Sequence, residues 1–410
     1  MTPFRYTCTV CSRSFARDEV RYLCPECGKS YRPGMPLKGV LEVTFDAEAL
    51  RRSFDPSRPS WDAFSAIEPE YFPAYPVGGT PLSPAALLGS EIGLDRLFLK
   101  NDGLNPSGSL KDRASFLMVA EANRLGESTI VTASTGNAAS ALAAVCAAAG
   151  KKAVIFVPST APRAKLAQIL LYGATLVPVA GTYDDAFALS LEYTAEEGGL
   201  NRNTAYHPLT IEGKKTAGLE IFAQSGMKAP DVIAVSAGDG VILHGIHKAF
   251  KDLLAAGLIR TLPRLLCVQA ETSDAIHRYF MTGAYSDALH PVTAADSISV
   301  RTPSNAHMAR RALVESRGTS VTVGDDEIRS AQALLARTTG IFAEPAAATA
   351  VAGLLRASTS GWIARGEHVV ALLTGHGLKD VDFALKGAKV PEPVPPDLDA
   401  VRTFLAVGRA

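Results

Sequence analysis

The feature that most constrains the fold of this chain is a regular alternation of helix-length and strand-length segments between residues 111 and 373. Short apolar runs are followed by longer stretches of helical pattern, and Gly126, Gly150 and Gly173 stand where helices should end. This alternation predicts parallel, doubly wound sheets. The expected helices are 113–124, 137–149, 162–172, 182–197, 213–226, 241–256, 326–338 and 345–360, and the expected strands are 128–132, 152–157, 175–179, 231–235, 264–269 and 367–373.

We therefore expect an α/β fold of two doubly wound αβα lobes. Residues 46–110 and 217–388 would form the larger lobe, and residues 111–216 the smaller one. A separate unit at 1–45 precedes them, and a Pro-rich linker with a short helix at 389–410 follows. In doubly wound folds, ligands bind at the carboxyl ends of the strands.

The N-terminal unit carries two C-x-x-C pairs, Cys8 with Cys11 and Cys24 with Cys27. Each pair can offer two thiolates to one tetrahedral ion, so we interpret the unit as a small zinc ribbon. The 12 residues between the pairs are slightly fewer than in the commonest spacing. Four protein ligands would leave no open position for catalysis, which makes the zinc structural. Disulfides or inert cysteines are the alternative.

The composition is that of an enzyme-sized globular chain without a strong net charge. Its 410 residues include 41 basic and 41 acidic ones, which gives no indication of a nucleic-acid or acidic-membrane partner. The N-terminus lacks the apolar core of a signal peptide, and the apolar stretch 138–150 is too short for a membrane span. These features predict a cytoplasmic protein. Cys146 and Cys267 lie in apolar runs and should be core residues.

One lysine follows a turn-forming run in segment 105–113, Asn-Pro-Ser-Gly-Ser-Leu-Lys-Asp-Arg. Gly108 and Ser109 suit a tight turn and a helix start, so Lys111 should direct its amine into the cleft that the turn faces. Such an amine can form a Schiff base with an aldehyde when nearby positive charge or desolvation lowers its pKa. Taken alone, Lys111 is more simply a solvated lysine at the start of a helix.

Two further segments strengthen the chemical interpretation: 134–137 (Ser-Thr-Gly-Asn) and 236–240 (Ser-Ala-Gly-Asp-Gly). Each lies between an expected strand and an expected helix, an arrangement that binds anions. Together with Lys111, with Glu344-Pro-Ala and with 374–380 (Thr-Gly-His-Gly-Leu-Lys-Asp), they make the chain resemble the pyridoxal-phosphate enzymes of the tryptophan synthase β and threonine synthase type. The resemblance covers roughly residues 70–385, with the motifs in that family's order.

The resemblance implies pyridoxal 5′-phosphate (PLP) as cofactor and Lys111 as the catalytic residue, a general base at the substrate's α-carbon. The N–H groups of the turn 237–241 would hold the cofactor's phosphate, and the Thr374 hydroxyl would contact its ring nitrogen. Asn137 would contact both the substrate's carboxylate and the cofactor's phenolic oxygen. The implied cofactor-binding residues are Lys111, Asn137, Ala237, Gly238, Asp239, Gly240, Val241 and Thr374. The implied substrate-binding residues are Ser134, Thr135 and Asn137.

The activity of threonine synthases would imply O-phospho-L-homoserine as substrate, with water adding at its β-carbon, and the family implies a homodimer. Three positions depart from the pattern: Ala138 stands where many such enzymes have Thr, His207 where many have Asn, and Thr210 where many have Arg. An arginine is a natural phosphate clamp. Lys214, Lys215 or Arg202 could take its place.

Other functions stay open because of these departures. β-Replacement on O-phosphoserine, as in cysteate or cysteine synthase, would use the same machinery, and a serine/threonine dehydratase would need no substrate-phosphate site. The zinc ribbon and segment 374–380 favour the threonine synthase type. A degenerate PLP-fold binding protein is the non-enzymatic alternative, against which Lys111 argues. Asp239, an acid close to a dianion, should turn outward or cap its helix. His376 should be a packing or surface group, with a proton shuttle as the alternative.

Overall fold

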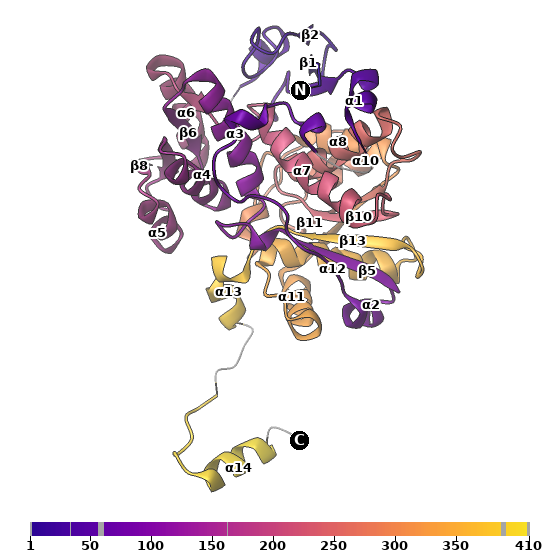
Figure 1. Ribbon diagram of the computed structural model, residues 1–410. Coiled ribbons are helices and arrows are strands. Elements are labelled where there is room, and N and C mark those ends of the chain that lie inside the picture. The colour runs from indigo at the N-terminus through magenta and orange to yellow at the C-terminus, as the bar shows by residue number, and fades with distance from the viewer. Residues whose placement is uncertain (1, 33, 56–60, 162, 387–390, 408–410) are drawn as a thin grey trace.

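The computed structural model describes residues 2–32, 34–55, 61–161, 163–386 and 391–407 (Figure 1). Two largely parallel sheets with flanking helices form its body. The N-terminal strands lie at the top of the view in Figure 1, and the C-terminal helix lies apart below. The predicted fold class, an α/β fold with parallel sheets behind a small cysteine-bearing unit, is confirmed.

The larger sheet has six strands from two distant parts of the chain. In spatial order they are β12 (Thr319–Val323), β11 (Arg264–Ala270), β10 (Val232–Ser236), β13 (His368–Leu373), β5 (Arg96–Asn101) and β4 (Leu82–Pro84). Neighbouring strands are parallel, except that the edge strand β4 runs antiparallel to β5.

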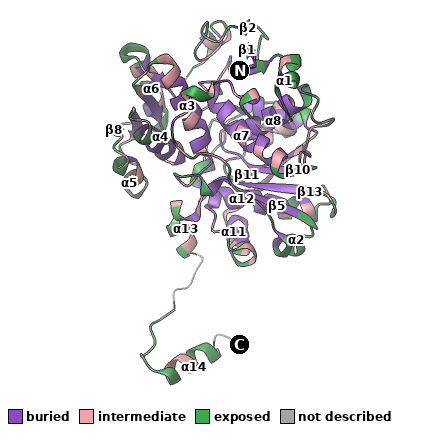
Figure 2. Ribbon diagram, viewed as in Figure 1, coloured by how far each residue is buried: buried purple, intermediate pink, exposed green. Residues whose placement is uncertain are grey.

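Both faces of this sheet are buried, as continuous apolar runs in parallel strands predict. Along β10, Ile233 and Val235 belong to the hydrophobic core that includes α8 (Val241–Ala255). Val232 and Ala234 point the other way, into a second core with α12 (Pro345–Thr359), which packs across β10, β11 and β13. Figure 2 shows these strands and α12 as buried.

The smaller sheet has four parallel strands: β8 (Thr175–Val179), β7 (Lys152–Pro158), β6 (Thr129–Ala133) and β9 (Leu200–Asn201). Helix α6 (Tyr183–Glu197) packs on one face through a separate apolar cluster. Helix α4 (Asn137–Ala148) contacts β6 and β7 and packs against α3 (Lys111–Leu125), and α5 (Arg163–Leu171) packs on α4. The boundaries proposed for the two lobes stay a prediction.

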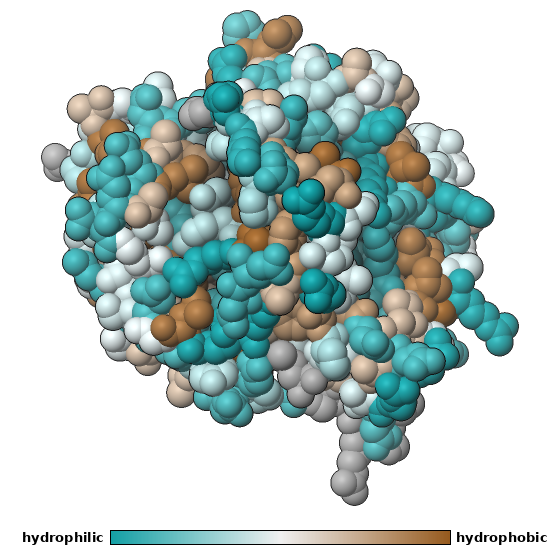
Figure 3. Space-filling model, turned by 90° about the horizontal axis from the view of Figure 1, so that it is seen from above, coloured by the Kyte–Doolittle hydropathy of each residue, from teal (hydrophilic) through white to brown (hydrophobic). Residues whose placement is uncertain are grey.

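The N-terminal unit is a three-stranded antiparallel sheet in the order β2-β1-β3. Its strands are β1 (Phe4–Cys8), β2 (Ser14–Phe15) and β3 (Leu41–Phe45), and the short 3-10 helix η1 (Cys27–Ser30) begins at the last of the four cysteines. Tyr6 and Phe15 are buried between this sheet and the main core. The face seen from above in Figure 3 is mostly hydrophilic, with apolar groups in small separate patches.

The sequence pattern missed several elements and misplaced one start. Helix α7 (Leu209–Gln224) begins four residues before the predicted 213, and no prediction was made for β12 or α10 (Ala306–Glu315). The remaining helices are α1 (Ala47–Ser53), α2 (Ala86–Ile92), α9 (Ala275–Thr282), α11 (Asp325–Thr339), α13 (Val381–Lys386) and α14 (Leu398–Val407).

The predicted C-terminal helix is present as α14, while part of the predicted linker, residues 389–390, lies outside the described residues, as do 408–410. In Figure 1 α14 lies away from the body, and Leu398 and Leu405 are 62% and 56% exposed. Among the helices that the structure describes, none is long and apolar enough to cross a membrane.

Candidate active site

An inner cavity of about 30 Å³ contains the predicted lysine and three other predicted residues or segments. Lys111 is the first residue of α3, Asn137 is the first of α4, and Thr374 directly follows β13. The turn 237–241, between β10 and α8, completes this part of the lining. The structure therefore brings together residues that are up to 263 positions apart in sequence, counted from Lys111 to Thr374.

Main-chain hydrogen bonds hold the Lys111 turn beside the Thr374 turn. Leu110 N donates to Thr374 O (2.9 Å), and His376 N donates to Gly108 O (3.0 Å). Gly108 has a φ of 86°, a left-handed conformation that favours glycine. The tight turn that the sequence predicts before Lys111 is thus confirmed, and its partner is the segment that contains Thr374.

The electrostatic environment lowers the pKa of the Lys111 amine below its ordinary value. Burial is the main cause of the lowering, and the positive charge of Arg202 adds to it. The negative charges of Asp239 and Glu344 act in the opposite direction and raise the pKa. A lowered pKa leaves more of the amine neutral near pH 7, which is the form that attacks an aldehyde or accepts a proton.

A buried ion-pair network fixes the helix that Lys111 begins. Arg113 Nε donates to Asp102 Oδ2 (2.6 Å), and Arg113 Nη1 donates to Glu220 Oε1 on α7 (2.7 Å). Lys100 Nζ on β5 donates to Glu220 Oε2 (2.5 Å). Because Arg113 is two residues beyond Lys111, this network ties the start of α3 to both β5 and α7.

The turn 237–241 has the properties of an anion-binding turn. The first N–H groups of α8 have no acceptor within their own helix and open towards the cavity. Gly240 has a φ of 80°, and a Cβ on Gly238 would lie 2.9 Å from the Ile298 Cα. Ser236 Oγ is buried without a hydrogen-bond partner among the described residues and lines the same cavity.

Asn137 and Glu344 form a polar contact that the sequence did not predict. Asn137 Nδ2 donates to both Glu344 carboxylate oxygens, at 3.1 and 2.8 Å. Glu344 is the residue before α12, and burial raises its pKa while the Asn137 hydrogen bonds lower it. The motif Glu344-Pro-Ala marked the position in the sequence, but its proximity to Asn137 depends on how α12 and α4 meet.

An outer cavity of about 300 Å³ adjoins the inner one. The two share Asn137, Ser297, Glu344 and Ala346 in their linings. Thr135 and Gly136 line the outer cavity, as does Lys379, whose Nζ donates to Ser140 Oγ (3.0 Å) and Gln168 Oε1 (2.6 Å).

Ser134 does not line either of these two cavities. Its hydroxyl accepts a hydrogen bond from Gly136 N (3.3 Å) and so shapes the turn. Its predicted contact with a substrate carboxylate stays a prediction.

The three cations considered for a phosphate clamp have different surroundings. Lys214 lines the inner cavity, and its Nζ donates to Thr204 Oγ1 (2.7 Å). Lys215 instead pairs with Glu212 and Asp252. Arg202 is buried, donates from Nε to Ser115 Oγ (3.3 Å), and its Nη2 has no partner among the described residues. Thr210 itself bonds the nearby main chain, donating to His207 O (2.8 Å).

The prediction for Asp239 was wrong, and that for His376 agrees with the geometry. Asp239 lines the inner cavity and does not cap α8; its Oδ1 accepts from Ser304 N (3.0 Å), so a loop distant in sequence sets its direction. His376 Nδ1 accepts from Leu378 N (3.1 Å) at the start of the 3-10 helix η6 (Gly377–Lys379).

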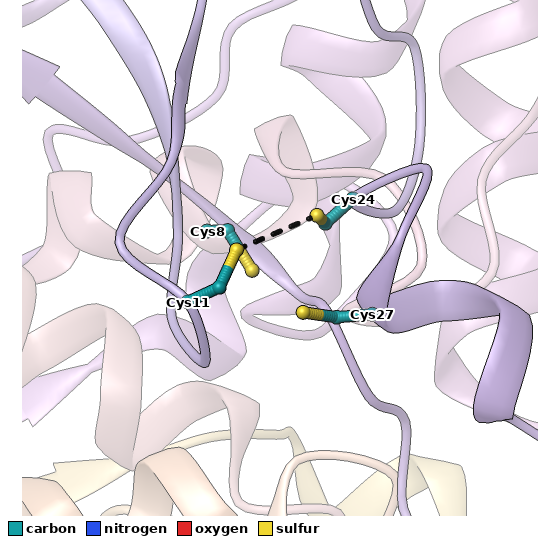
Figure 4. A group of neighbouring side chains, drawn as sticks. All are labelled: Cys8, Cys11, Cys24 and Cys27. Atoms are coloured by element: carbon teal, nitrogen blue, oxygen red, sulfur yellow. Dashed lines mark hydrogen bonds between the residues drawn. The ribbon is translucent and has the colours of Figure 1, made fainter.

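The four predicted metal ligands are close together in the N-terminal unit (Figure 4). The Sγ atoms of Cys8, Cys11, Cys24 and Cys27 all lie within 4.8 Å of one another, and Cys11 Sγ is 3.8 Å from Cys24 Sγ. A tetrahedral zinc ion with bonds of about 2.3 Å would place its sulfur ligands about 3.8 Å apart. The cluster can therefore hold a zinc ion. Burial raises the pKa of the Cys146 and Cys267 thiols to about 12, and both are core residues as predicted.

Solved structures share the fold of the body. The processed form of threonine deaminase isoform 2 from Solanum lycopersicum matches with a TM-score of 0.66 at 22% identity, covering 75% of this chain and 87% of that one. Maize serine racemase matches with a TM-score of 0.63 at 20% identity, covering 80% and 92%.

Curated relatives match at higher identity and over more of the chain. A threonine synthase of Methanocaldococcus jannaschii is 34% identical over 97% of this chain and 98% of its own length. A threonine synthase of Methanosarcina acetivorans is 35% identical with the same coverage, and one of Mycobacterium tuberculosis is 38% identical over 79% of this chain. Residues 74–375 match the family described as pyridoxal-phosphate dependent enzyme. The chain belongs to this family of PLP-dependent enzymes.

Proposed function

We propose that this enzyme converts O-phospho-L-homoserine and water to L-threonine and inorganic phosphate. The observation that carries the proposal is the meeting of Lys111, Thr374 and the turn 237–241 around one cavity. The relatives named threonine synthase, which match almost the full chain, support the choice of reaction.

The chemistry of the residues around the inner cavity fits PLP, while the volume of about 30 Å³ is too small to hold the whole cofactor without movement of the lining. The free N–H groups of turn 237–241 and the unpartnered hydroxyl of Ser236 suit its phosphate, and the Lys111 amine suits its aldehyde. The Thr374 hydroxyl would face the ring nitrogen. The Asn137 amide, which donates to Glu344, would have to turn an N–H group towards the phenolic oxygen. When bound, PLP supplies an electron sink that stabilises negative charge next to the substrate's amino group.

Within this arrangement Lys111 carries the proton transfers. Its lowered pKa provides a neutral amine, which would take the proton from the substrate's α-carbon. A neutral threonine hydroxyl at position 374 would leave the ring nitrogen largely unprotonated, whereas an aspartate there would favour protonation. That choice suits elimination of the γ-phosphate and disfavours transamination.

The outer cavity would receive the substrate. Thr135, Gly136 and Asn137 at the start of α4 would bind its carboxylate, because a helix start offers free N–H groups to an anion. Lys379, the cation that lines this cavity, carries charge complementary to the substrate's phosphate. The cavity volume of about 300 Å³ falls within the range of small-ligand sites.

The cysteine cluster would hold a structural zinc ion. The oligomeric state and the cellular location of the protein follow from the proposed enzyme class. All four tetrahedral positions would be occupied by thiolates. From that class we expect a homodimer in the cytoplasm that acts on a small-molecule amino acid. The balanced charge of 41 basic and 41 acidic residues agrees with the expectation that it binds no nucleic acid.

Product analysis tests the proposed reaction. Purified enzyme is given O-phospho-L-homoserine, O-phospho-L-serine with and without sulfite or sulfide, and L-serine or L-threonine. Threonine and phosphate from the first substrate are expected. A sulfur-containing amino acid from O-phosphoserine would replace the proposal with β-replacement, and a keto acid from unphosphorylated serine or threonine would replace it with a dehydratase. The dehydratase is the second candidate because Thr210 stands in place of an arginine.

A further inference from the structure

One buried lysine lacks a carboxylate partner. Among the described residues four lysines are buried, and three of them have a carboxylate oxygen at 3.1 Å or less: Lys100, Lys215 and Lys248. Lys214 is 0% exposed, and its Nζ bonds only the Thr204 hydroxyl. No described carboxylate lies within 4.0 Å of it.

An unpaired buried ammonium group is costly, because the protein interior replaces little of the solvation that it loses. The cost is removed when an anion binds beside the amine. Burial lowers the pKa of Lys214 well below its usual value, and the charges of Lys111 and Arg202 lower it further, while Asp239 acts against them. The position of Lys214 indicates which anion its amine can bind.

Lys214 lies beside the start of α8, where the anion-binding turn is. A Cβ on Gly245 would lie 2.8 Å from the Lys214 Cβ, so α7 and α8 touch at this point. Gly245 is one helical turn beyond Val241, the first residue of α8. From there the Lys214 side chain reaches the same cavity as the turn 237–241 and the unpartnered Ser236 hydroxyl.

The two cavities separate the two phosphates that the enzyme would handle. Lys214 lines the inner cavity together with Lys111 and the turn 237–241, but not the outer cavity. Thr135 and Gly136, at the proposed carboxylate site, line only the outer one, with Lys379. The position of Lys214 therefore favours the cofactor's phosphate over the substrate's.

We propose that Lys214 binds the phosphate group of PLP as a cationic partner to the helix start of α8. The inference goes beyond the proposed reaction and rests on it only in requiring PLP. It also explains how the site can tolerate Asp239, which lines the same cavity and would add negative charge beside the phosphate dianion of PLP. Lys214 offsets that charge, since Asp239 accepts a main-chain hydrogen bond from Ser304 and has no cation in contact among the described residues.

Cofactor titration of the apoenzyme tests this assignment directly. The apoenzyme is titrated with PLP and, separately, with pyridoxal, which lacks the phosphate, and binding is followed by visible absorbance. Lys214→Met is expected to weaken PLP binding about 10- to 100-fold, as loss of a charged hydrogen bond does, and to leave pyridoxal binding unchanged. Lys379→Met, the matched control in the outer cavity, is expected to keep the PLP affinity.

Two further variants keep the test decisive if Lys214→Met fails to fold. Lys214→Gln retains a donor for Thr204, and Asp239→Asn retains the acceptor for Ser304 N. The double variant Lys214→Gln with Asp239→Asn should regain part of the PLP affinity that Lys214→Gln loses, because both charges beside the phosphate are then removed.

An unchanged PLP affinity in both Lys214 variants would overturn the assignment. So would an unchanged PLP affinity combined with a raised KM for O-phospho-L-homoserine, which would place Lys214 at the substrate's phosphate. The titration needs no turnover, so a failure of the proposed reaction would leave its result unaffected.

Discussion

Lys111 and Lys214 are two amines in one cavity, and their neighbours give them different tasks. Lys111 begins α3 beside Thr374, whereas Lys214 lies on α7 beside the start of α8. Local turn and helix signals predict the position of Lys111, and the accompanying motifs, through their resemblance to PLP enzymes, predict its task. The direction of Lys214 depends on the contact between α7 and α8, and the direction of Asp239 depends on the loop at Ser304. Neither contact leaves a local signal.

Thr374 provides a prediction at the scale of one hydroxyl. Thr374→Val keeps the shape of this buried side chain but removes the group that would contact the ring nitrogen. We expect kcat/KM for O-phospho-L-homoserine to fall about tenfold, the equivalent of one hydrogen bond, with melting temperature retained. Thr374→Ser, which keeps the hydroxyl, is the control. Equal activity of the Val and Ser variants would remove Thr374 from the site.

At the scale of elements, the ends of the strands and the starts of the helices build the site. Apolar runs buried on both faces made most strands predictable, as in β10 and β13. The edge strand β12 escaped prediction because three of its five residues, Thr319, Ser320 and Thr322, are polar and leave no continuous apolar run. Helix α10, with two adjacent arginines in the middle of its apolar pattern, escaped for a similar reason.

The network that ties α3 to α7 predicts a pH-dependent stability. Burial acts to raise the pKa of Glu220, but the hydrogen bonds and charges of Arg113 and Lys100 lower it to about 2, from an ordinary 4.5. A depressed carboxyl pKa contributes stability that is complete above about pH 4.5 and is lost as the pH falls towards 2.

Glu220→Gln tests this network. Removing one partner of a buried ion pair should lower the free energy of unfolding by about 3–5 kcal/mol at pH 7, and the difference from the wild type should shrink below pH 4.5. Urea unfolding at several pH values measures both. Glu196→Gln, at an exposed position on α6, should show neither effect. A Glu220→Gln deficit that stays constant down to pH 3 would contradict the account.

At the scale of the whole molecule, the N-terminal unit packs against segments that line the inner cavity. Leu37 N donates to Ser304 O (2.9 Å), and the N–H of the same Ser304 donates to Asp239 Oδ1. Glu42 Oε1 lies 2.7 Å from His244 Nε2 on α8. The ring of Tyr22 stacks on Tyr206, with centroids 4.6 Å apart. The paired cysteines predicted this unit, but not where it docks.

Removal of the metal should therefore lower the stability of the whole N-terminal unit, and not only change the cysteine cluster. We expect about one zinc ion per chain, which Cys24→Ser should lose. The loss should destabilise residues 1–45 by at least about 5 kcal/mol, because a structural zinc supplies much of the folding energy of a small unit. Metal analysis and amide hydrogen exchange measure the two effects. Cys146→Ala should keep the zinc. Full zinc occupancy in Cys24→Ser would exclude the four-thiolate site.

The central claim is that Lys111, among the lysines of this cavity, carries the cofactor. Borohydride reduction of the PLP-loaded enzyme, followed by peptide mass spectrometry, tests it most directly, because reduction makes the bond between lysine and cofactor permanent. The account predicts the phosphopyridoxyl group on the peptide that contains Lys111, and its loss together with the visible absorbance band in Lys111→Ala. The group on the peptide that contains Lys214, or a band that survives in Lys111→Ala, would contradict it.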